Sequence, residues 1–280
     1  MRIAKIHHDY EIGDVFYNFY LGDGHVDGYG FDSNYFNKQM DYALTLNANI
    51  ILMGDFLSMI THQDIKRYSK DEDIYETSDI INEAVCLAVG YLKPYAKNIS
   101  VMMCGNHETY ITKNHNIDIV KNIIDELNNI EGVDIQYLGY TGYIVHNFQY
   151  KKGGFSYKYT GFLDHGKGSG RGTTGLTAMM GRAIADYYAH AHTHHSIVLP
   201  SEIKSYINNK GNLSFKEIIC FVVGACLKPI TVSSLKKNGK SRAYNPNYGE
   251  EKMKHLQSRG GIFLQHTAES KEIIKTRVIC

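Results

Sequence analysis

The stretch Val101-Met102-Met103-Cys104-Gly105-Asn106-His107-Glu108 decides the fold that this chain is expected to adopt. A short apolar run stops at a glycine and is followed at once by an amide, an imidazole and a carboxylate. Apolar runs of this length beside glycine are typical of buried strands. Polar side chains just past the carboxyl end of such a strand lie where open α/β sheets bind ligands. A site is predicted here only if other strands end in the same way.

Four further apolar segments end in oxygen or imidazole donors. They cover residues 15–21, 50–53, 157–163 and 187–195, and their donors are Asp23, His25, Asp55, His165, His192 and His194. In an extended segment residues i and i+2 point to the same side, so Asp23 and His25 are expected to aim at one centre. The same alternation is expected to bring His192 and His194 together. A lone Asp-x-His is more often a surface group and a lone Gly-Asp more often a turn, whereas His165 alone and His192-x-His194 alone are evenly balanced. Five such motifs at strand ends in one chain predict a shared site.

Helical patterns alternate with these strands. Asp32-Ser33 is expected to cap one helix, and Ser78 or Asp79 to open another that ends before Pro94. Two more helices are predicted over residues 117–127 and 174–185, and residues 61–77 are expected to form a loop or short helices. Further strands are predicted at 133–148, 197–199, 217–227, 262–265 and 273–278. This order indicates an α/β fold in one domain over residues 1–280, with a motif-bearing core at 15–195 and a strand-rich completion at 196–280.

The donor types indicate which metals the site would take. Mixed carboxylate, amide and imidazole donors suit first-row metals such as Mn, Fe, Zn or Ni better than an all-oxygen magnesium cage. There are also more donors than one tetrahedral site uses. Two divalent metal ions are therefore expected, with a carboxylate able to bridge them and with Mn as the first candidate.

The ordered motifs resemble those of the calcineurin-like metallophosphoesterases. They are Asp23-Gly24-His25, Gly54-Asp55, Gly105-Asn106-His107-Glu108, His165-Gly166 and Ala191-His192-Thr193-His194. Their layout is similar to that of small stand-alone and phage-encoded members of this superfamily. The resemblance implies a β-sandwich flanked by helices, with the metals at the carboxyl ends of strands.

The resemblance also implies a role for each of these residues. One metal would be held by Asp23, His25 and His194. The other would be held by Asn106, His165 and His192, and Asp55 would bridge the two. A metal-bridging hydroxide would attack phosphorus in line, and His107 would act as the general acid for the leaving oxygen.

Two positions depart from the family pattern. Ser58 stands where the family often has a carboxylate or amide that orients the catalytic histidine. What orients His107 is therefore open, and Glu108 is a candidate only because it is adjacent in sequence. The second departure is Ala191, which replaces the usual glycine in front of the last histidine pair.

Two segments could recognise a substrate. Residues 166–175 are rich in glycine, and their Lys167 and Arg171 could bind a phosphate, although a flexible turn explains the segment equally well. Residues 228–259 are basic and include Tyr244 and Tyr248, a combination that can pair phosphates and stack bases. An ordinary solvated surface also has this composition, so nucleic acid is an alternative partner rather than the predicted one.

Composition limits the remaining classes of protein. The chain has 280 residues, 43% hydrophobic content and a net charge of +1, which is typical of a globular protein without a strong field for nucleic acid. No apolar run reaches the length of a membrane span, and the amino terminus has no signal-peptide pattern. The five cysteines show no CxxC spacing, which favours free thiols in a reducing compartment. A cytoplasmic location is expected, in the host cytoplasm if the protein is viral, and protein partners are not predicted.

The expected function is hydrolysis of a phosphate ester by a dinuclear metal-dependent phosphoesterase, with a phosphodiester preferred. Three alternatives stay open. The first is a DNA or RNA nuclease that uses the basic segment 228–259, and the second is a phosphomonoesterase. The third is a scaffold that keeps the fold and has lost the chemistry.

Overall fold

The computed structural model describes most of the chain. The described residues are 1–28, 30–59, 79–167, 172–208, 211–228, 236–237, 240–241 and 258–279. Arg171, the segment 61–77, Tyr244, Tyr248 and most of the basic segment 228–259 lie outside these ranges, so their predictions stay untested.

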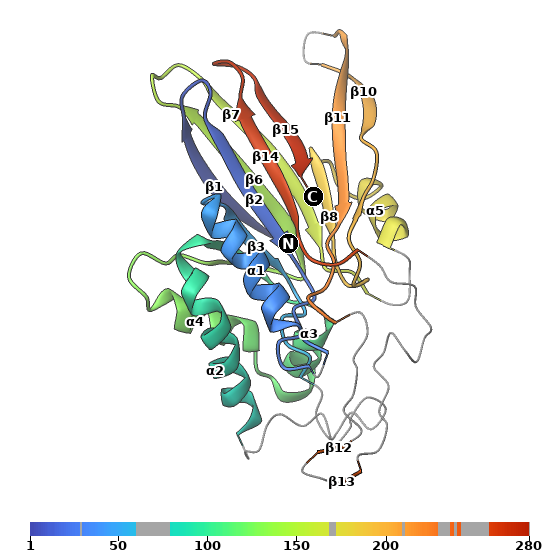
Figure 1. The fold of residues 1–280 in the computed structure, drawn as a ribbon. Coiled ribbons are helices and arrows are strands. Elements are labelled where there is room, and N and C mark those ends of the chain that lie inside the picture. The colour runs from blue at the N-terminus through green and yellow to red at the C-terminus, as the bar shows by residue number, and fades with distance from the viewer. Residues whose placement is uncertain are drawn as a thin grey trace.

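Two mixed sheets form the centre of the structure (Figure 1). The first sheet has the order β1 (Arg2–Tyr10), β6 (Thr141–Tyr150), β7 (Ser156–Asp164), β8 (Tyr187–His190), β11 (Leu213–Val222) and β10 (Glu202–Ile207), and β9 (Ile197–Val198) also pairs with β11. The second sheet has the order β15 (Ile274–Ile279), β14 (Ile262–Ala268), β2 (Val15–Leu21), β3 (Asn49–Met53), β4 (Ile99–Met103) and β5 (Gln136–Gly139). Two short strands, β12 (Lys236–Lys237) and β13 (Lys240–Ser241), pair separately.

The two sheets pack face to face through a shared apolar core. Tyr20 and Ile51 of the second sheet belong to the same buried cluster as Phe148, Tyr187 and Phe221 of the first. These residues alternate along their strands with residues of the outer faces, as expected for strands buried between layers. The inner faces therefore form the middle of a β-sandwich.

Helices cover both outer faces of the sandwich (Figure 1). The helices are α1 (Ser33–Thr45), α2 (Ile80–Leu92), the 3-10 helix η2 (Lys93–Asn98), α3 (Asn106–His115), α4 (Ile119–Asn128) and α5 (Gly172–Met180). A second buried cluster joins the second sheet to all of these helices except α5. A third cluster joins Phe162 and Val222 of the first sheet to Leu176 of α5. The α/β class predicted from the sequence is confirmed as two mixed sheets with helices. No helix in the described ranges is long and apolar enough to span a membrane.

Several local predictions are confirmed. The strand β2 has the predicted bounds, β4 contains the apolar run that begins the stretch 101–108, and Asp32 caps α1 by accepting a hydrogen bond from the Tyr35 amide at 3.1 Å. Asp79 caps α2, which ends at Leu92, two residues before Pro94. The apolar spacing and the capping residues therefore determine these elements locally.

Other elements were missed or misplaced. The sequence predicted none of β1, β10 and α3. In β1 the buried positions include His8, and in α3 only Glu108 and Ile111 are buried, so neither element shows a clean apolar pattern. The predicted helix 174–185 is wrong at its end, because α5 stops at Met180.

The direction of the strands sets the position of the loops. Strands β2, β3 and β4 run parallel to one another in the second sheet. In the first sheet β7, β8 and β11 are also parallel. The carboxyl ends of parallel strands meet at one edge of a sheet, and the loops with the predicted donors follow these ends.

Candidate metal centre

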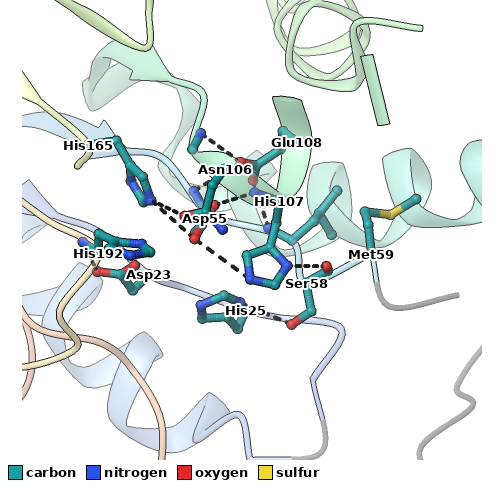
Figure 2. Close-up of polar contacts among 12 residues, drawn as sticks. Asp23, His25, Asp55, Ser58, Met59, Asn106, His107, Glu108, His165 and His192 are labelled. Atoms are coloured by element: carbon teal, nitrogen blue, oxygen red, sulfur yellow. Dashed lines mark hydrogen bonds and ion pairs between the residues drawn. The ribbon is translucent and has the colours of Figure 1, made fainter. Parts of the chain in front are cut away.

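The loops after β2, β3, β4, β7 and β8 bring their polar side chains together at this edge (Figure 2). The side chains that gather there are Asp23, His25, Asp55, Asn106, His107, His165, His192 and His194. All eight residues are those singled out from the sequence. They come from segments up to 171 positions apart (194 − 23), so the fold has to assemble the centre.

One group of donors consists of Asp23, His25 and His194. One donor atom from each residue lies within 4.8 Å of the others. The Nε2 atoms of His25 and His194 are 3.2 Å apart, and His194 Nε2 is 3.6 Å from Asp23 Oδ1. Asp23 Oδ1 is buried and has no hydrogen-bond partner, whereas Oδ2 accepts from the His192 amide at 2.9 Å. A buried carboxylate oxygen beside two imidazole nitrogens is the arrangement that a cation would complete.

A second group consists of Asp55, His165 and His192, whose donor atoms also lie within 4.8 Å of one another. Asp55 Oδ2 is 3.1 Å from His165 Nε2. Asp55 also belongs to a third such group with His25 and His107. Its carboxylate therefore lies between the two sides of the centre.

The Asn106 amide closes the second group. Its Oδ1 lies 3.2 Å from His165 Nε2. The terminal amide atom at this position is also 2.7 Å from His192 Nδ1 and 3.1 Å from Asp55 Oδ2. Asp55 Oδ2 and His192 Nδ1 can accept hydrogen bonds, so hydrogen bonding to these two neighbours would place the amide nitrogen there. A cation among these atoms would instead require the carbonyl oxygen.

The outer ring nitrogens of three histidines are anchored. His165 Nδ1 donates to the Met53 carbonyl at 2.8 Å, and His107 Nδ1 donates to the Ser58 carbonyl at 2.6 Å. A carbonyl oxygen can only accept, so Nδ1 carries the proton in both rings. His25 Nδ1 lies 3.0 Å from Ser58 Oγ. These contacts turn the three Nε2 atoms inward, which is how second-shell partners orient metal-binding histidines.

The backbone at the donors differs from the prediction. Asp23, His25, Asp55, His192 and His194 have φ values of 50, 47, 49, 70 and 62°. The expected extended alternation of Asp23 with His25, and of His192 with His194, is therefore wrong, although both pairs reach the centre. Strands β2 and β8 end at Leu21 and His190, before the donors begin. Left-handed backbone costs side-chain-bearing residues about 1–2 kcal/mol each, so the surrounding structure has to hold it.

Hydrogen bonds hold this strained backbone in place. The Asp23 amide donates to the Gly54 carbonyl at 3.0 Å, and the His25 amide donates to the Asp55 carbonyl at 3.1 Å. The loops also touch so closely that a Cβ on Gly105 would lie 2.1 Å from Asp55 Oδ1. Glycine at position 105 is therefore required for the approach of the two loops.

Three buried carboxylates lie in or beside the centre, and they are those of Asp23, Asp55 and Glu108. Burial, reinforced by the charge of Asp55, raises the pKa of Asp23 to about 8. The same two causes raise the pKa of Glu108 to about 7. In the part of the chain that the structure describes, no lysine or arginine forms an ion pair with these carboxylates.

His165 supplies part of the missing positive charge. Burial opposes the charge of an imidazolium, but Asp55 outweighs it and raises the pKa of His165 to about 10. Burial likewise opposes ionisation of Asp55, and the charge and hydrogen bond of His165 hold its pKa below the usual range. A cation would replace the His165 proton and lower the pKa of Asp23, because it favours the ionised carboxylate and the neutral imidazole. The residues present therefore fit one or more divalent metal ions.

The departure at Ser58 has a structural explanation. The backbone carbonyl of Ser58, and no side-chain carboxylate, anchors His107 Nδ1. Glu108 does not orient His107. It accepts hydrogen bonds from the amides of Asp55, Leu57 and Gly105 at 3.0, 3.0 and 2.8 Å. The other departure, Ala191, is fully buried in the core between the sheets, 3.0 Å from where a Cβ on Gly22 would lie.

The remaining candidates lie at the margin of the centre. Lys167 is exposed and follows His165 and Gly166, so it stays only a candidate for substrate binding. His190 ends β8 on the outer face of the first sheet, and its Nδ1 lies 3.8 Å from Asp164 Oδ2. Sequence reasoning missed Asp27, whose buried carboxylate accepts from the amides of Ser58 and Met59. No pattern of residue types marks Asp27 for this role.

Comparison with known proteins adds little to these observations. No model of a known protein family matches the chain. No curated protein matches it either. Among solved structures, the chain is similar to one described as "GAP50 the anchor in the inner membrane complex of Plasmodium". The identity is 12%, the match covers 94% of this chain and 88% of that chain, and the TM-score is 0.41. A likeness this distant carries no argument about the activity, which has to come from the geometry of the site.

Proposed function

We propose that this chain is a metal-dependent phosphoesterase of the calcineurin-like type that hydrolyses a phosphate ester, with a phosphodiester preferred. The observation that carries the proposal is the position of Asp55 between two groups of donors. Asp23, His25 and His194 would hold one metal ion, and Asn106, His165 and His192 would hold the other. Asp55 would contact both. The packed sheets with helices on both outer faces agree with the sandwich that the motif resemblance implies.

The bound metals would supply the Lewis acidity that activates water and neutralises charge on the phosphate oxygens. The chemistry of the donors favours first-row metals. The groups contain carboxylate, amide and imidazole donors and no thiolate, which suits Mn and also Fe, Zn or Ni.

His107 is suited to act on the leaving group. Its Nδ1–H donates to the Ser58 carbonyl, which turns Nε2 toward the centre, 3.9 Å from Asp55 Oδ2. Protonated at Nε2, it would give its proton to the leaving oxygen of the ester. His107 belongs to a group that could itself hold a metal, so metal content must be measured together with activity.

The alternatives differ in the evidence they need. A nuclease would have to use the basic segment 228–259, most of which lies outside the described residues. A phosphomonoesterase would use the same donors and differ only in its substrate contacts. A scaffold without activity is disfavoured because all eight donor and acid residues are present and converge.

The proposal is tested by metal analysis and by assays of purified protein. We expect metal to copurify and Mn²⁺ to support hydrolysis of bis-p-nitrophenyl phosphate. p-Nitrophenyl phosphate, a cyclic nucleotide and single-stranded DNA and RNA should be assayed in parallel to identify the substrate class. Asp55→Asn should lower turnover by about 10³-fold or more, since the ligand shared by both metals would lose its charge and one of its two acceptor oxygens.

The His107→Ala variant separates catalysis from metal binding. It should retain the wild-type metal content and lose turnover by about 10²-fold or more, mainly with poor leaving groups. Full activity of Asp55→Asn would refute the proposed centre. A metal loss in His107→Ala equal to that of Asp55→Asn would make His107 a ligand.

A further inference from the structure

The loop of residues 55–59 is held by two buried carboxylates from different elements. Glu108, in the first turn of α3, accepts from the amides of Asp55 and Leu57. Asp27, in the loop after β2, accepts from the next two amides, those of Ser58 and of Met59, the latter at 2.8 Å. The loop that carries the bridging candidate Asp55 therefore depends on side chains that do not reach the centre themselves.

The two hydrogen bonds from the amides of Ser58 and Met59 to Asp27 form what we call the Asp27 clamp. Ser58 connects this clamp to two histidines of the centre. Its carbonyl oxygen accepts from His107 Nδ1 at 2.6 Å, and its Oγ lies 3.0 Å from His25 Nδ1. The rings of His25 and His107 are perpendicular, with an interplanar angle of 82°, and their centroids lie 5.0 Å apart. A shift of the Ser58 backbone would therefore move the anchors of both rings.

We propose that Asp27 is a positioning residue for His107, acting through the backbone of Ser58. This inference rests on the proposed function, in which His107 protonates the leaving oxygen. The carboxylate fixes the Ser58 amide, and the carbonyl of the same residue fixes the Nδ1–H tautomer and the direction of Nε2. In the family pattern a carboxylate or amide at position 58 would orient His107 directly. Here position 58 is a serine, and the carboxylate of Asp27 orients His107 through two hydrogen bonds, one on each side of the Ser58 backbone.

The chemistry of the clamp requires an aspartate at position 27. Two amide donors point at one side chain that is 6% exposed, so both of its oxygens must accept. Asparagine offers one acceptor and turns an NH₂ group toward the second amide. Asp27→Asn therefore keeps almost the same shape and yet removes one of the two hydrogen bonds of the clamp. Charged acceptors also make stronger hydrogen bonds than neutral ones.

The neighbouring residues provide matched controls. Ser58→Ala removes the Oγ contact to His25 and keeps the backbone carbonyl that anchors His107. Glu108→Gln weakens the hold on Asp55 and leaves the Asp27 clamp in place. If Asp27 acts through the Ser58 backbone, Asp27→Asn should change the ring of His107 more than Glu108→Gln does, and Ser58→Ala should leave it unchanged.

The first measurement does not depend on turnover. In Zn²⁺-loaded protein, long-range ¹H–¹⁵N NMR should show His107 of the wild type with its proton on Nδ1. Asp27→Asn should shift the Nδ1 and Nε2 signals toward a mixture of tautomers, and Ser58→Ala should leave them unchanged. Thermal unfolding and metal content establish that the variant is folded and loaded, and Asp27→Ser is the second variant if Asp27→Asn does not fold.

The second measurement uses aryl phosphodiesters with leaving groups of different basicity. Asp27→Asn should slow the poor leaving group by about 10–100-fold and the good one by less than about 3-fold. In the His107→Ala background the same change should add little, because the two residues act as one unit. A loss that is equal for all leaving groups, or additive with His107→Ala, would overturn the positioning role.

The two measurements distinguish the ways in which the proposals can fail. If the wild type hydrolyses no phosphate ester, the proposed function fails, and the tautomer of His107 still decides whether Asp27 positions it. An unchanged His107 signal in Asp27→Asn overturns the inference whatever the activity.

Discussion

Two sets of histidines distinguish the two ends of the sandwich. The edge histidines His25, His165, His192 and His194 lie at the carboxyl ends of the strands, with Asp23 and Asp55 among them. The core histidines His8, His146 and His266 lie between the sheets, on β1, β6 and β14. Five of these seven side chains are buried, and those of His192 and His194 are half-buried, yet only the edge set is arranged to hold a metal.

Partners of the core histidines are neutral. His8 Nε2 lies 3.5 Å from His146 Nδ1, and His146 Nε2 lies 3.0 Å from the Tyr187 hydroxyl. His266 Nδ1 lies 2.8 Å from Thr276 Oγ1. The His8 ring also stacks on Phe148, with the centroids 4.6 Å apart. Within the described ranges no carboxylate forms an ion pair with these rings, and their nitrogens do not converge as the edge donors do.

The difference shows that a carboxylate partner can outweigh burial in deciding the charge of a histidine. Burial lowers the pKa of His266 to about 3 and that of His8 to about 4. His165 is equally buried, but Asp55 raises its pKa to about 10. A buried histidine is thus a candidate ligand only where a carboxylate and a second donor meet it.

The largest effect on metal content and turnover is expected from a substitution in the edge set, and a substitution in the core set should change neither. His192→Ala should remove metal and lower turnover by about 10³-fold or more, because one metal loses a ligand. His266→Leu should keep the wild-type metal content and turnover. Elemental analysis and diesterase assays of the two variants check this contrast. Metal loss in His266→Leu would show that the core histidines belong to the metal-binding unit.

How far the sequence predicted the structure also differs between local and long-range features. Strands β2 and β4 follow from apolar runs that stop at glycine, a signal confined to a few adjacent residues. The order of the donor motifs predicted which side chains would meet. Helix α3 was missed because it buries only Glu108 and Ile111, which gives almost no helical apolar pattern.

The supports of the candidate centre could not be predicted in the same way. The Ser58 carbonyl that anchors His107 is a backbone group, which every residue type carries. Asp27 reaches Ser58 only after the loops behind β2 and β3 come together in space. The left-handed backbone at Asp23 and His192 depends likewise on bonds between loops, and alternation along an extended strand does not describe it.

Acid should weaken the fold through the core histidines. His8 has a pKa of about 4 in the folded protein and about 6.5 when unfolded, so below pH 6.5 the unfolded chain binds the extra proton. Stability attributable to His8 is therefore lost as the pH falls from 6.5 to about 4, by roughly 3 kcal/mol in total. His8→Phe should remove this part of the acid sensitivity.

Urea unfolding between pH 4.5 and 7.5, with a chelator present, measures the effect without a contribution from metal. His7→Gln is the matched control, because His7 precedes His8 on β1 and is exposed. Its acid slope should stay steeper than that of His8→Phe, because burial, the main cause of the lowered pKa of His8, is unchanged in this variant. An acid slope in His8→Phe that is as steep as that of the wild type would contradict the role of the core set.

The smallest expected effect concerns the neutral partner of His266. Thr276→Val keeps the shape of the side chain and removes the hydroxyl 2.8 Å from His266 Nδ1, and His266 Nε2 already has no hydrogen-bond partner. The loss should cost about 1–2 kcal/mol of unfolding free energy at neutral pH, because a buried polar nitrogen is left unsatisfied. Metal content and turnover should stay at the wild-type values, since the pair lies among neutral groups of the core. A change in metal content on loss of this one hydroxyl would show instead that the two ends of the sandwich are coupled, and that the core histidines help to set the geometry of the edge.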